Sequence, residues 1–351
     1  MHSDGRGADQ LLLLDFSKIE HGHRAQYNAM IAALFDTRRV GLGWTSLTSR
    51  RPVLVPGIEA SPLGYALLCL VRSVLGRRTA ALLLRPLPVV QASSLRLRAK
   101  GIVLALLKRF PGNTILTIIP FAVEPGFNKI ANDWIYDLQN WDRQMSDIGV
   151  AEPNSPAPAV PGLAMQIAAT ADGRGVCCAV GRQDEGKGFH HFAEQYCRAP
   201  ALREAALFAY GGSVSPSLKL QARQLAEAGG FGLDRFVSDD ELIELYRAAD
   251  LIWCVYGPDY DQASGILGRA MQLGLPVISR RGSVIARLCE IEDHPQIAFD
   301  PLTEQLDLHE FPARIPPGQA HARARRHGQI SLIKLSRALG IAPAADPFAA
   351  P

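Results

Sequence analysis

Motifs for metal, redox and dinucleotide chemistry are missing from this sequence. Its six cysteines show no CxxC spacing, so we expect neither a zinc site nor a redox pair. Gly173-Arg174-Gly175 does not extend into a GxGxxG fingerprint, and no Walker motif occurs. NAD-binding and P-loop chemistry therefore have no support. Most of the cysteines lie in apolar runs, and we expect them to be buried, reduced thiols.

The sequence also lacks a membrane-spanning run. The most apolar helical stretch, residues 62–75, is interrupted by Arg72 and is too short to cross a bilayer. Residues 1–10 are polar and do not resemble a signal peptide. We therefore expect a cytoplasmic protein.

Acidic residues are almost absent from residues 37–110, where thirteen Arg and Lys accompany one acid, Glu59. Such a basic segment fits a polyanionic partner, and anionic lipid headgroups or a lipid-diphosphate acceptor suit it. A solvated basic face would give the same composition. The aromatic residues that stack on single-stranded nucleic acid are too few here, so we expect no nucleic-acid partner.

The order of the remaining patterns predicts an α/β protein. With 351 residues the chain is long enough for two domains. Apolar strand-length runs alternate with helical stretches on both sides of a proline-rich segment, residues 150–162, which predicts parallel βαβ units. We expect Rossmann-like domains over residues 1–165 and 166–315, followed by a terminal helix and tail over residues 316–351. The expected strands are residues 11–15, 40–47, 80–84, 114–120, 175–180 and 205–210.

Residues 237–280 are the most informative part of the chain. A helix with the capping box Ser238 and Glu241 leads into an apolar strand and a short acidic loop. A second helix then begins at Ser264-Gly265, and Gly-Leu-Pro leads into another strand. This order puts a helix N-terminus, with unpaired N–H groups, at the carboxyl edge of a parallel sheet, where phosphorylated ligands bind. Helix capping alone would also explain a serine at residue 264, without any ligand.

A second phosphate signal follows the strand at residues 175–180. Gly181-Arg182 comes directly after it, and Lys187-Gly188 precedes a helix. Glycine lets the backbone approach a ligand, and the two cations would neutralise a diphosphate. Such bases are also common on ordinary surfaces. Because both signals fall on the same edge of one sheet, we expect a nucleotide-diphosphate site there.

The first domain offers a loop and an aromatic cluster. After the strand at residues 11–15, Gly22 permits a turn, and Glu20, His21 and His23 would face a cleft. We expect Gly22 and His23 to contact an acceptor and His23 to act as a general base, although loop histidines are often only exposed. The run DWIYDLQNWD, residues 133–142, could hold a sugar or pack in the core.

Taken together, these residues resemble the GT-B-fold glycosyltransferases, especially the retaining class that uses nucleotide sugars. The resemblance rests on Gly-Arg and Lys-Gly at residues 181–188, the Asp239–Asp250 segment, the Ser-Gly turn and the AxxxGxPV pattern at residues 270–277. It implies two Rossmann-like domains facing a central cleft, with the C-terminal helix crossing back to the first. The donor-binding residues it implies are Gly181, Arg182, Lys187, Gly212, Val237, Ser264, Gly265 and Arg269.

The resemblance implies transfer of a sugar from a nucleotide-diphosphate donor to a glycan or lipid-linked acceptor, as in surface polysaccharide assembly. We expect the catalytic residues to be His23, Arg182, Lys187 and Asp261. The resemblance implies no cofactor and no metal, because the two cations take the metal's place. Many relatives carry two glutamates eight positions apart where this chain has Asp261 and Arg269, and Arg269 cannot accept hydrogen bonds from a ribose.

Three other interpretations stay open at this point. A non-catalytic protein of the same fold would bind a sugar nucleotide or a partner. An epimerase or phosphorylase would act without an acceptor glycan. Asp259-Tyr260-Asp261 is a DxD sequence, and two carboxylates there could hold a divalent metal.

Overall fold

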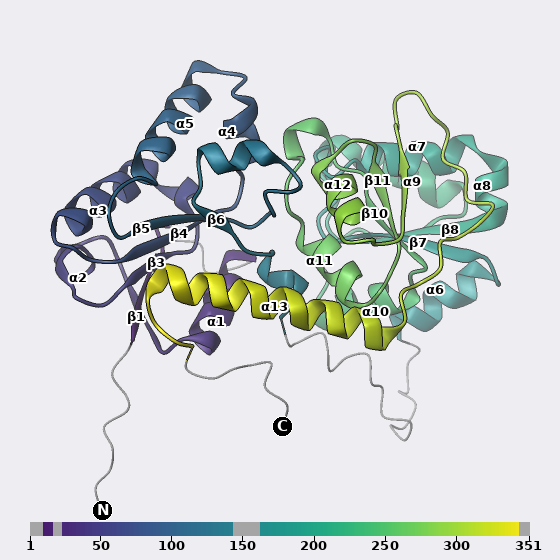
Figure 1. Ribbon diagram of the computed structural model, residues 1–351. Helices are drawn as coiled ribbons and strands as arrows, with labels where there is room; N and C mark the ends of the chain where they lie inside the picture. The colour runs from purple at the N-terminus through teal and green to yellow at the C-terminus, as the bar shows by residue number, and fades with distance from the viewer. Residues whose placement is uncertain (1–9, 17–22, 143–161, 344–351) are drawn as a thin grey trace, which may run out of the picture. The chain divides into compact units, whose positions relative to one another are not determined.

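The computed structural model describes residues 10–16, 23–142 and 162–343, apart from the side chains of residues 23–26. The chain forms two compact units, coloured along the sequence in Figure 1. Unit 1 combines the described residues up to Asp142 with those from Arg325 onward. Unit 2 contains the described residues from Gly162 to Ala324. The proline-rich segment lies outside the described residues except for Gly162.

Unit 1 is built on a parallel six-stranded sheet in the order β2-β1-β3-β4-β5-β6 (Figure 1). The strands are β1 (Leu11–Leu14), β2 (Thr37–Val40), β3 (Val53–Val55), β4 (Thr79–Leu83), β5 (Asn113–Thr117) and β6 (Asp133–Trp134). The helices are α1 (His23–Leu34), α2 (Trp44–Thr48), α3 (Pro62–Val74), α4 (Leu87–Gln91), α5 (Leu95–Leu107) and α13 (Pro317–Leu339), which enters this unit at Arg325.

Unit 2 is built on a second parallel six-stranded sheet in the order β12-β11-β10-β7-β8-β9. Its strands are β7 (Gly175–Val180), β8 (Ala206–Gly211), β9 (Phe231–Leu233), β10 (Leu251–Cys254), β11 (Val277–Arg280) and β12 (Gln296–Phe299). Its helices are α6 (Leu163–Ala171), α7 (Phe189–Arg198), α8 (Pro200–Ala205), α9 (Lys219–Glu227), α10 (Asp239–Ala248), α11 (Gly265–Gln272) and α12 (Val284–Ile291).

The predicted α/β class is confirmed, and in both units the strand order reverses once. In unit 2 the order equals the doubly wound order 3-2-1-4-5-6, with the reversal between β7 and β10. In unit 1 it lies between β1 and β3. Such a reversal opens a crevice at the carboxyl ends of the two strands, because the following loops turn to opposite faces.

The prediction of a strand over residues 40–47 is wrong. The chain pairs with β1 earlier, over Thr37–Val40, and then forms the short helix α2. Gly43 precedes this helix, and its N–H donates to Ser46 Oγ at 3.0 Å. Glycines interrupt the apolar pattern here and favour a turn over a strand.

A buried arginine fixes the segment around α2. Arg72 of α3 is fully buried, and its guanidinium donates to the carbonyl oxygens of Ser46 (2.8 Å), Ser49 (3.2 Å), Arg51 (2.7 Å) and Arg78 (2.9 Å). Burial lowers its pKa to about 10, and Arg77 adds to the shift. One of the thirteen cations counted in the sequence is therefore part of the core.

The cysteines lie in the interior as predicted. All six are free thiols, and all are buried except the half-buried Cys197. Burial raises the pKa of Cys69, Cys178, Cys254 and Cys289, so these thiols stay protonated at neutral pH.

We expect Arg72→Met to lower the free energy of unfolding by about 3 kcal/mol, because it leaves several buried carbonyl groups without a donor. Urea unfolding followed by circular dichroism measures the change. Arg96→Met, at an exposed position on α5, is the control and should change stability by less than about 0.5 kcal/mol. Equal effects of the two substitutions would contradict the role given to Arg72.

Candidate functional site

The strand reversal in unit 2 lies beside the predicted phosphate residues. β7 and β10 are neighbours, with Leu251 paired to Cys177 and Ile252 to Cys178. The loop after β7 contains residues 181–188, and the loop after β10 contains residues 255–264. Both loops therefore begin at the carboxyl edge where ligands of such sheets bind.

Glycine is required where β7 and β8 end. Gly212 has a φ of +139°, and a Cβ atom on it would lie 1.9 Å from the carbonyl oxygen of Gly181. Gly181 has a φ of +79° and its N–H donates to the Gly211 oxygen at 2.9 Å. The main chain at this edge is thus bare of side chains, which leaves it open to close approach by a ligand.

Lys187 brings a cation to this bare edge. A Cβ atom on Gly181 would lie 3.3 Å from Lys187 Nζ. The side chain is half-buried, and burial lowers the pKa of its ammonium, with Asp184 and Cys254 opposing the shift. Within the described ranges no hydrogen bond or ion pair involves Nζ. A half-buried ammonium that has lost part of its hydration gains from a nearby negative charge, so this position favours a bound anion.

The remaining residues of the β7 loop hold this geometry. Gly188 has a φ of +68°, and a Cβ atom there would lie 2.0 Å from the oxygen of Val255. The N–H of Gly257 donates to the Gly186 oxygen at 2.8 Å. These contacts join the β7 loop to the β10 loop. Arg182 differs from Lys187, because its side chain is 72% exposed and its Nε lies 3.7 Å from Asp184 Oδ2.

Ser264 is the N-cap of α11, as predicted. Its Oγ accepts from Leu267 N at 3.4 Å and lies 2.8 Å from the hydroxyl of Tyr256. No hydrogen bond in the part of the chain that the structure describes uses the backbone N–H of Gly265 or Ile266. This helix end therefore offers two donors to an anion.

Asp261 is engaged inside the protein. It is buried, and its carboxylate accepts from Val284 N at 2.9 Å and 3.1 Å and from Arg280 Nη2 at 2.9 Å. Burial raises the pKa of this carboxyl, and the Val284 hydrogen bond and the charge of Arg280 oppose the shift. Both oxygens thus tie the β10 loop to the start of α12.

The structure adds two residues that the sequence interpretation missed. Arg280, the last residue of β11, donates from Nε to the oxygen of Tyr256 at 2.8 Å, and Tyr256 in turn touches Ser264. A basic residue at the carboxyl end of a neighbouring strand was the available signal for Arg280. Nothing in the local pattern distinguished Tyr256 from a core aromatic residue.

Two other predicted donor residues are buried. Arg269 lies in the last turn of α11, and its Nη1 is 3.2 Å from Gln272 Oε1. Val237 immediately precedes Ser238, the N-cap of α10, whose capping box with Glu241 is present. Neither side chain has a described contact with Lys187.

The predicted acceptor residues are Gly22 and His23. His23 is the first residue of α1, and its side chain is not placed. Gly22, Glu20 and His21 lie outside the described residues. α1 follows β1, so His23 starts the helix after the first strand of the β1–β3 reversal of unit 1.

The aromatic-acidic run at residues 133–142 packs within unit 1. Tyr136 stacks on His327 with ring centroids 3.7 Å apart, and Lys334 Nζ lies 3.3 Å from the centroid of Trp134. His327 and Lys334 belong to α13. Within unit 1 this run therefore packs against the C-terminal helix. Packing was one of the two roles that the sequence left open for it.

The described residues contain no group of three or more His, Cys, Asp or Glu side chains that could hold a metal ion. In the DxD sequence, Asp259 is exposed and Asp261 is already paired with Arg280. The pair thus does not present two open carboxylates.

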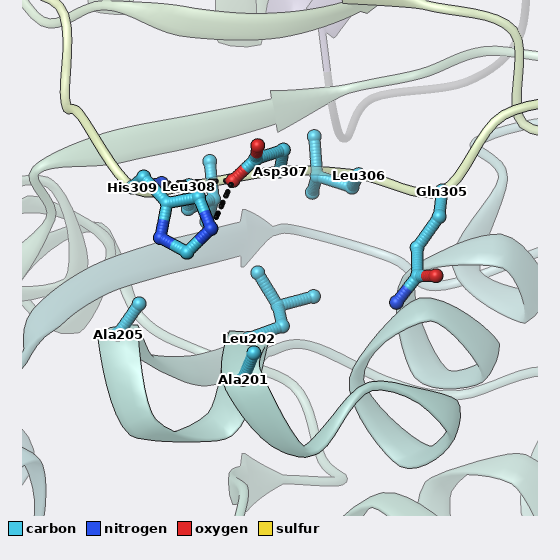
Figure 2. Close-up of a pocket in the computed structure, with 8 residues that line it drawn as sticks. All are labelled: Ala201, Leu202, Ala205, Gln305, Leu306, Asp307, Leu308 and His309. Atoms are coloured by element: carbon cyan, nitrogen blue, oxygen red, sulfur yellow. Dashed lines mark hydrogen bonds and ion pairs between the residues drawn. The ribbon is translucent and has the colours of Figure 1, made fainter.

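Two cavities in unit 2 contain none of the predicted site residues. One, of about 310 Å³, lies between α8 and residues 305–309, where Asp307 approaches His309 (Figure 2). The other, of about 720 Å³, lies between α7 and α9. α8 leads into the amino end of β8, so the smaller cavity is at the edge of the sheet opposite the phosphate residues.

We expect Gly212→Ala to lower the melting temperature far more than Gly229→Ala. Both glycines have positive φ, but a Cβ atom at Gly229 meets nothing within 4 Å. Backbone strain of about 1 kcal/mol is common to both, whereas only Gly212→Ala adds the clash with Gly181. Differential scanning fluorimetry compares the two. Equal melting temperatures would contradict the required close approach at this edge.

Comparison with known proteins supports the architecture. No protein-family model and no curated protein sequence matches this chain. The crystal structure of Anabaena HepE in complex with UDP matches with a TM-score of 0.64 at 14% identity, over 94% of this chain and 99% of that chain. HepE with UDP and glucose gives 0.60 at 15% identity, over 95% and 100%.

A UDP-forming α,α-trehalose-phosphate synthase from Burkholderia vietnamiensis matches with a TM-score of 0.52 at 10% identity, over 93% of this chain and 94% of that chain. At such identities the similarity shows the fold alone. With its two parallel six-stranded sheets, the chain has the GT-B fold that its sequence resemblance predicted.

Proposed function

We propose that this chain is a glycosyltransferase that uses a nucleotide-diphosphate sugar as its donor. The observation that carries the proposal is the half-buried Lys187 ammonium, which faces the bare main chain of Gly181 and has no acceptor among the described residues. A diphosphate would supply the missing negative charge. The similar fold of HepE, which binds UDP in its crystal structure, supports a nucleotide ligand.

The proposed roles follow from the positions of the residues. Lys187 would bind the diphosphate as a point charge, and the exposed Arg182 would close on it from solvent. Ser264 and the N–H groups of Gly265 and Ile266 would hold a phosphate oxygen. Charge builds up on the diphosphate as the sugar leaves, so these fixed cations and dipoles would lower the barrier to transfer.

The other predicted residues take supporting or untested roles in this proposal. Asp261 would position the β10 loop through Arg280, because both of its oxygens are engaged. Gly212 would keep the edge bare, and Val237 would border the nucleoside. Arg269 would act from inside α11. Gly22 and His23 would face the acceptor, with His23 as the general base.

We further propose a glycan or lipid-diphosphate acceptor, with a role in surface polysaccharide assembly and a cytoplasmic location at the membrane surface. The basic segment of residues 37–110 supports an anionic, lipid-linked acceptor. No helix among the described residues is long and apolar enough to cross a membrane. We propose that the reaction needs no metal and no cofactor.

One observation favours a second candidate, a non-catalytic protein that binds a sugar nucleotide. The carboxylate of Asp261 is occupied, and a buried arginine stands at residue 269, where many relatives have glutamate. These are the positions expected to contact the sugar and the ribose.

The two candidates differ in turnover. We expect the wild-type chain to release nucleoside diphosphate from one member of a panel of UDP-, GDP- and dTDP-sugars, with EDTA present, and the same nucleotide to raise the melting temperature. Lys187→Ala should lose at least about a hundredfold in release, since it removes a fixed charge from the leaving group. A thermal shift without release of nucleotide would favour the binding protein instead.

The control for this substitution is Lys129→Ala, an exposed lysine of unit 1. It should leave both the release rate and the thermal shift unchanged. If Lys187→Ala behaves like this control, the diphosphate is not bound at Gly181 and the proposed function is wrong.

The affinity for nucleoside diphosphate should also depend on pH. Because burial lowers the pKa of Lys187, its positive charge is present below that pKa and is lost as the pH rises through it. Affinity should therefore fall at a lower pH than for an ordinary lysine. In Lys187→Arg the fall should move to higher pH, since arginine stays charged. Titration calorimetry across alkaline pH measures this, and identical profiles would contradict the assignment.

A further inference from the structure

The outward side of α3 is apolar, although its inward side already packs in the core. Leu63, Leu67, Leu70 and Val74 are 86%, 48%, 53% and 80% exposed. Their spacing of four, three and four residues places them along one face of the helix. The buried residues of α3, such as Leu68, lie on the opposite face. A helix of a water-soluble protein normally carries polar residues on its outward face, so this one is unusual.

α5 carries a matching apolar row. Leu95, Ile102 and Leu106 are 81%, 63% and 52% exposed, while Leu104 and Leu107 are buried. α3 and α5 lie beside each other (Figure 1). Their buried residues join one core cluster with the same face of the sheet. The two exposed rows therefore point away from the sheet on the same side. We call them together the α3–α5 surface.

Basic side chains border this surface. Arg96 and Arg98 of α5 follow Leu95 by one and three positions, so at 100° per residue they lie on the two sides of the apolar row. Both are exposed. The ion pairs of the described residues include neither of them. Apolar residues flanked by cations are typical of helices that lie in a membrane interface.

Acidic residues are almost absent from this segment. Glu59 is the one acid of residues 37–110, and its carboxylate accepts from the backbone N–H of Arg85 at 2.7 Å. The exposed Arg38, Arg39 and Arg50 belong to the same segment. Two copies of such a surface would repel each other if they met face to face. An anionic bilayer satisfies both the charge and the apolar rows.

We propose that the α3–α5 surface docks unit 1 onto a bilayer that carries anionic lipid headgroups. Leu67, Leu70 and Ile102 insert among the acyl chains near the headgroups, while Arg96 and Arg98 contact lipid phosphates. The helices lie on the membrane and do not cross it, consistent with the finding for helix length. The α3–α5 surface would provide the membrane contact for the location proposed above. It does not depend on the nucleotide site.

Sedimentation with lipid vesicles tests the proposal. The wild-type chain should sediment with vesicles of phosphatidylcholine and phosphatidylglycerol, remain in solution with phosphatidylcholine alone, and be released by added salt. Leu67→Glu with Ile102→Glu should reduce binding by at least about tenfold, because both residues leave the apolar phase and add negative charge. Arg96→Gln with Arg98→Gln should reduce it by a similar factor.

The matched control changes an equally exposed apolar and basic pair elsewhere. Leu220→Glu with Arg223→Glu on α9 of unit 2 alters a leucine that is 61% exposed and should bind vesicles like the wild type. If the α3–α5 variants also bind like the wild type, or if the wild type binds no vesicle, the proposal is wrong. A dimer in solution that these variants abolish would assign the surface to a second copy instead.

Nucleotide binding separates this test from the proposed function. Every α3–α5 variant should keep the thermal shift given by the nucleoside diphosphate, which also shows that it is folded. Loss of vesicle binding with an intact thermal shift supports the surface. Vesicle binding that persists in a chain without any thermal shift would refute the nucleotide site and leave the surface intact.

Discussion

The candidate site depends on one steric constraint, the approach of Gly212 to the carbonyl oxygen of Gly181. A Cβ atom at Gly212 would lie 1.9 Å from that oxygen. Because β7 and β8 end in this contact, the main chain is exposed at the carboxyl edge of the sheet. The Lys187 ammonium then lies next to bare backbone, and the reversal of strand order between β7 and β10 gives a ligand space to enter. A cation, a glycine edge and a helix N-terminus meet here for reasons of backbone geometry.

The elements at the carboxyl edge of β7 were predictable because they depend on local sequence patterns. The strand at residues 175–180, the Gly-Arg and Lys-Gly pairs and the N-cap Ser264 each depend on a few neighbouring residues. The role of Asp261 was not predictable in this way. Its partners Arg280 and Val284 are 19 and 23 residues away, and only the packing of β11 and α12 against the β10 loop brings them together.

In unit 1, too, composition alone could not distinguish buried residues from exposed ones. Composition identified the basic segment, but it did not separate Arg72, which binds four carbonyl groups in the core, from the exposed arginines of α5. The leucines of α3 likewise appeared to belong to one apolar helix. Burial in the structure divides them into a core face and an exposed row, and this division distinguishes a candidate membrane surface from ordinary packing.

The central claim is that a diphosphate binds at the carboxyl edge of β7. A crystal structure of the chain with UDP, or with whichever nucleoside diphosphate raises the melting temperature most, tests it directly. We expect phosphate oxygens within hydrogen-bond distance of Lys187 Nζ and of the N–H groups of Gly265 and Ile266. A nucleotide in the cavity between α7 and α9, with Lys187 free of phosphate, would contradict it.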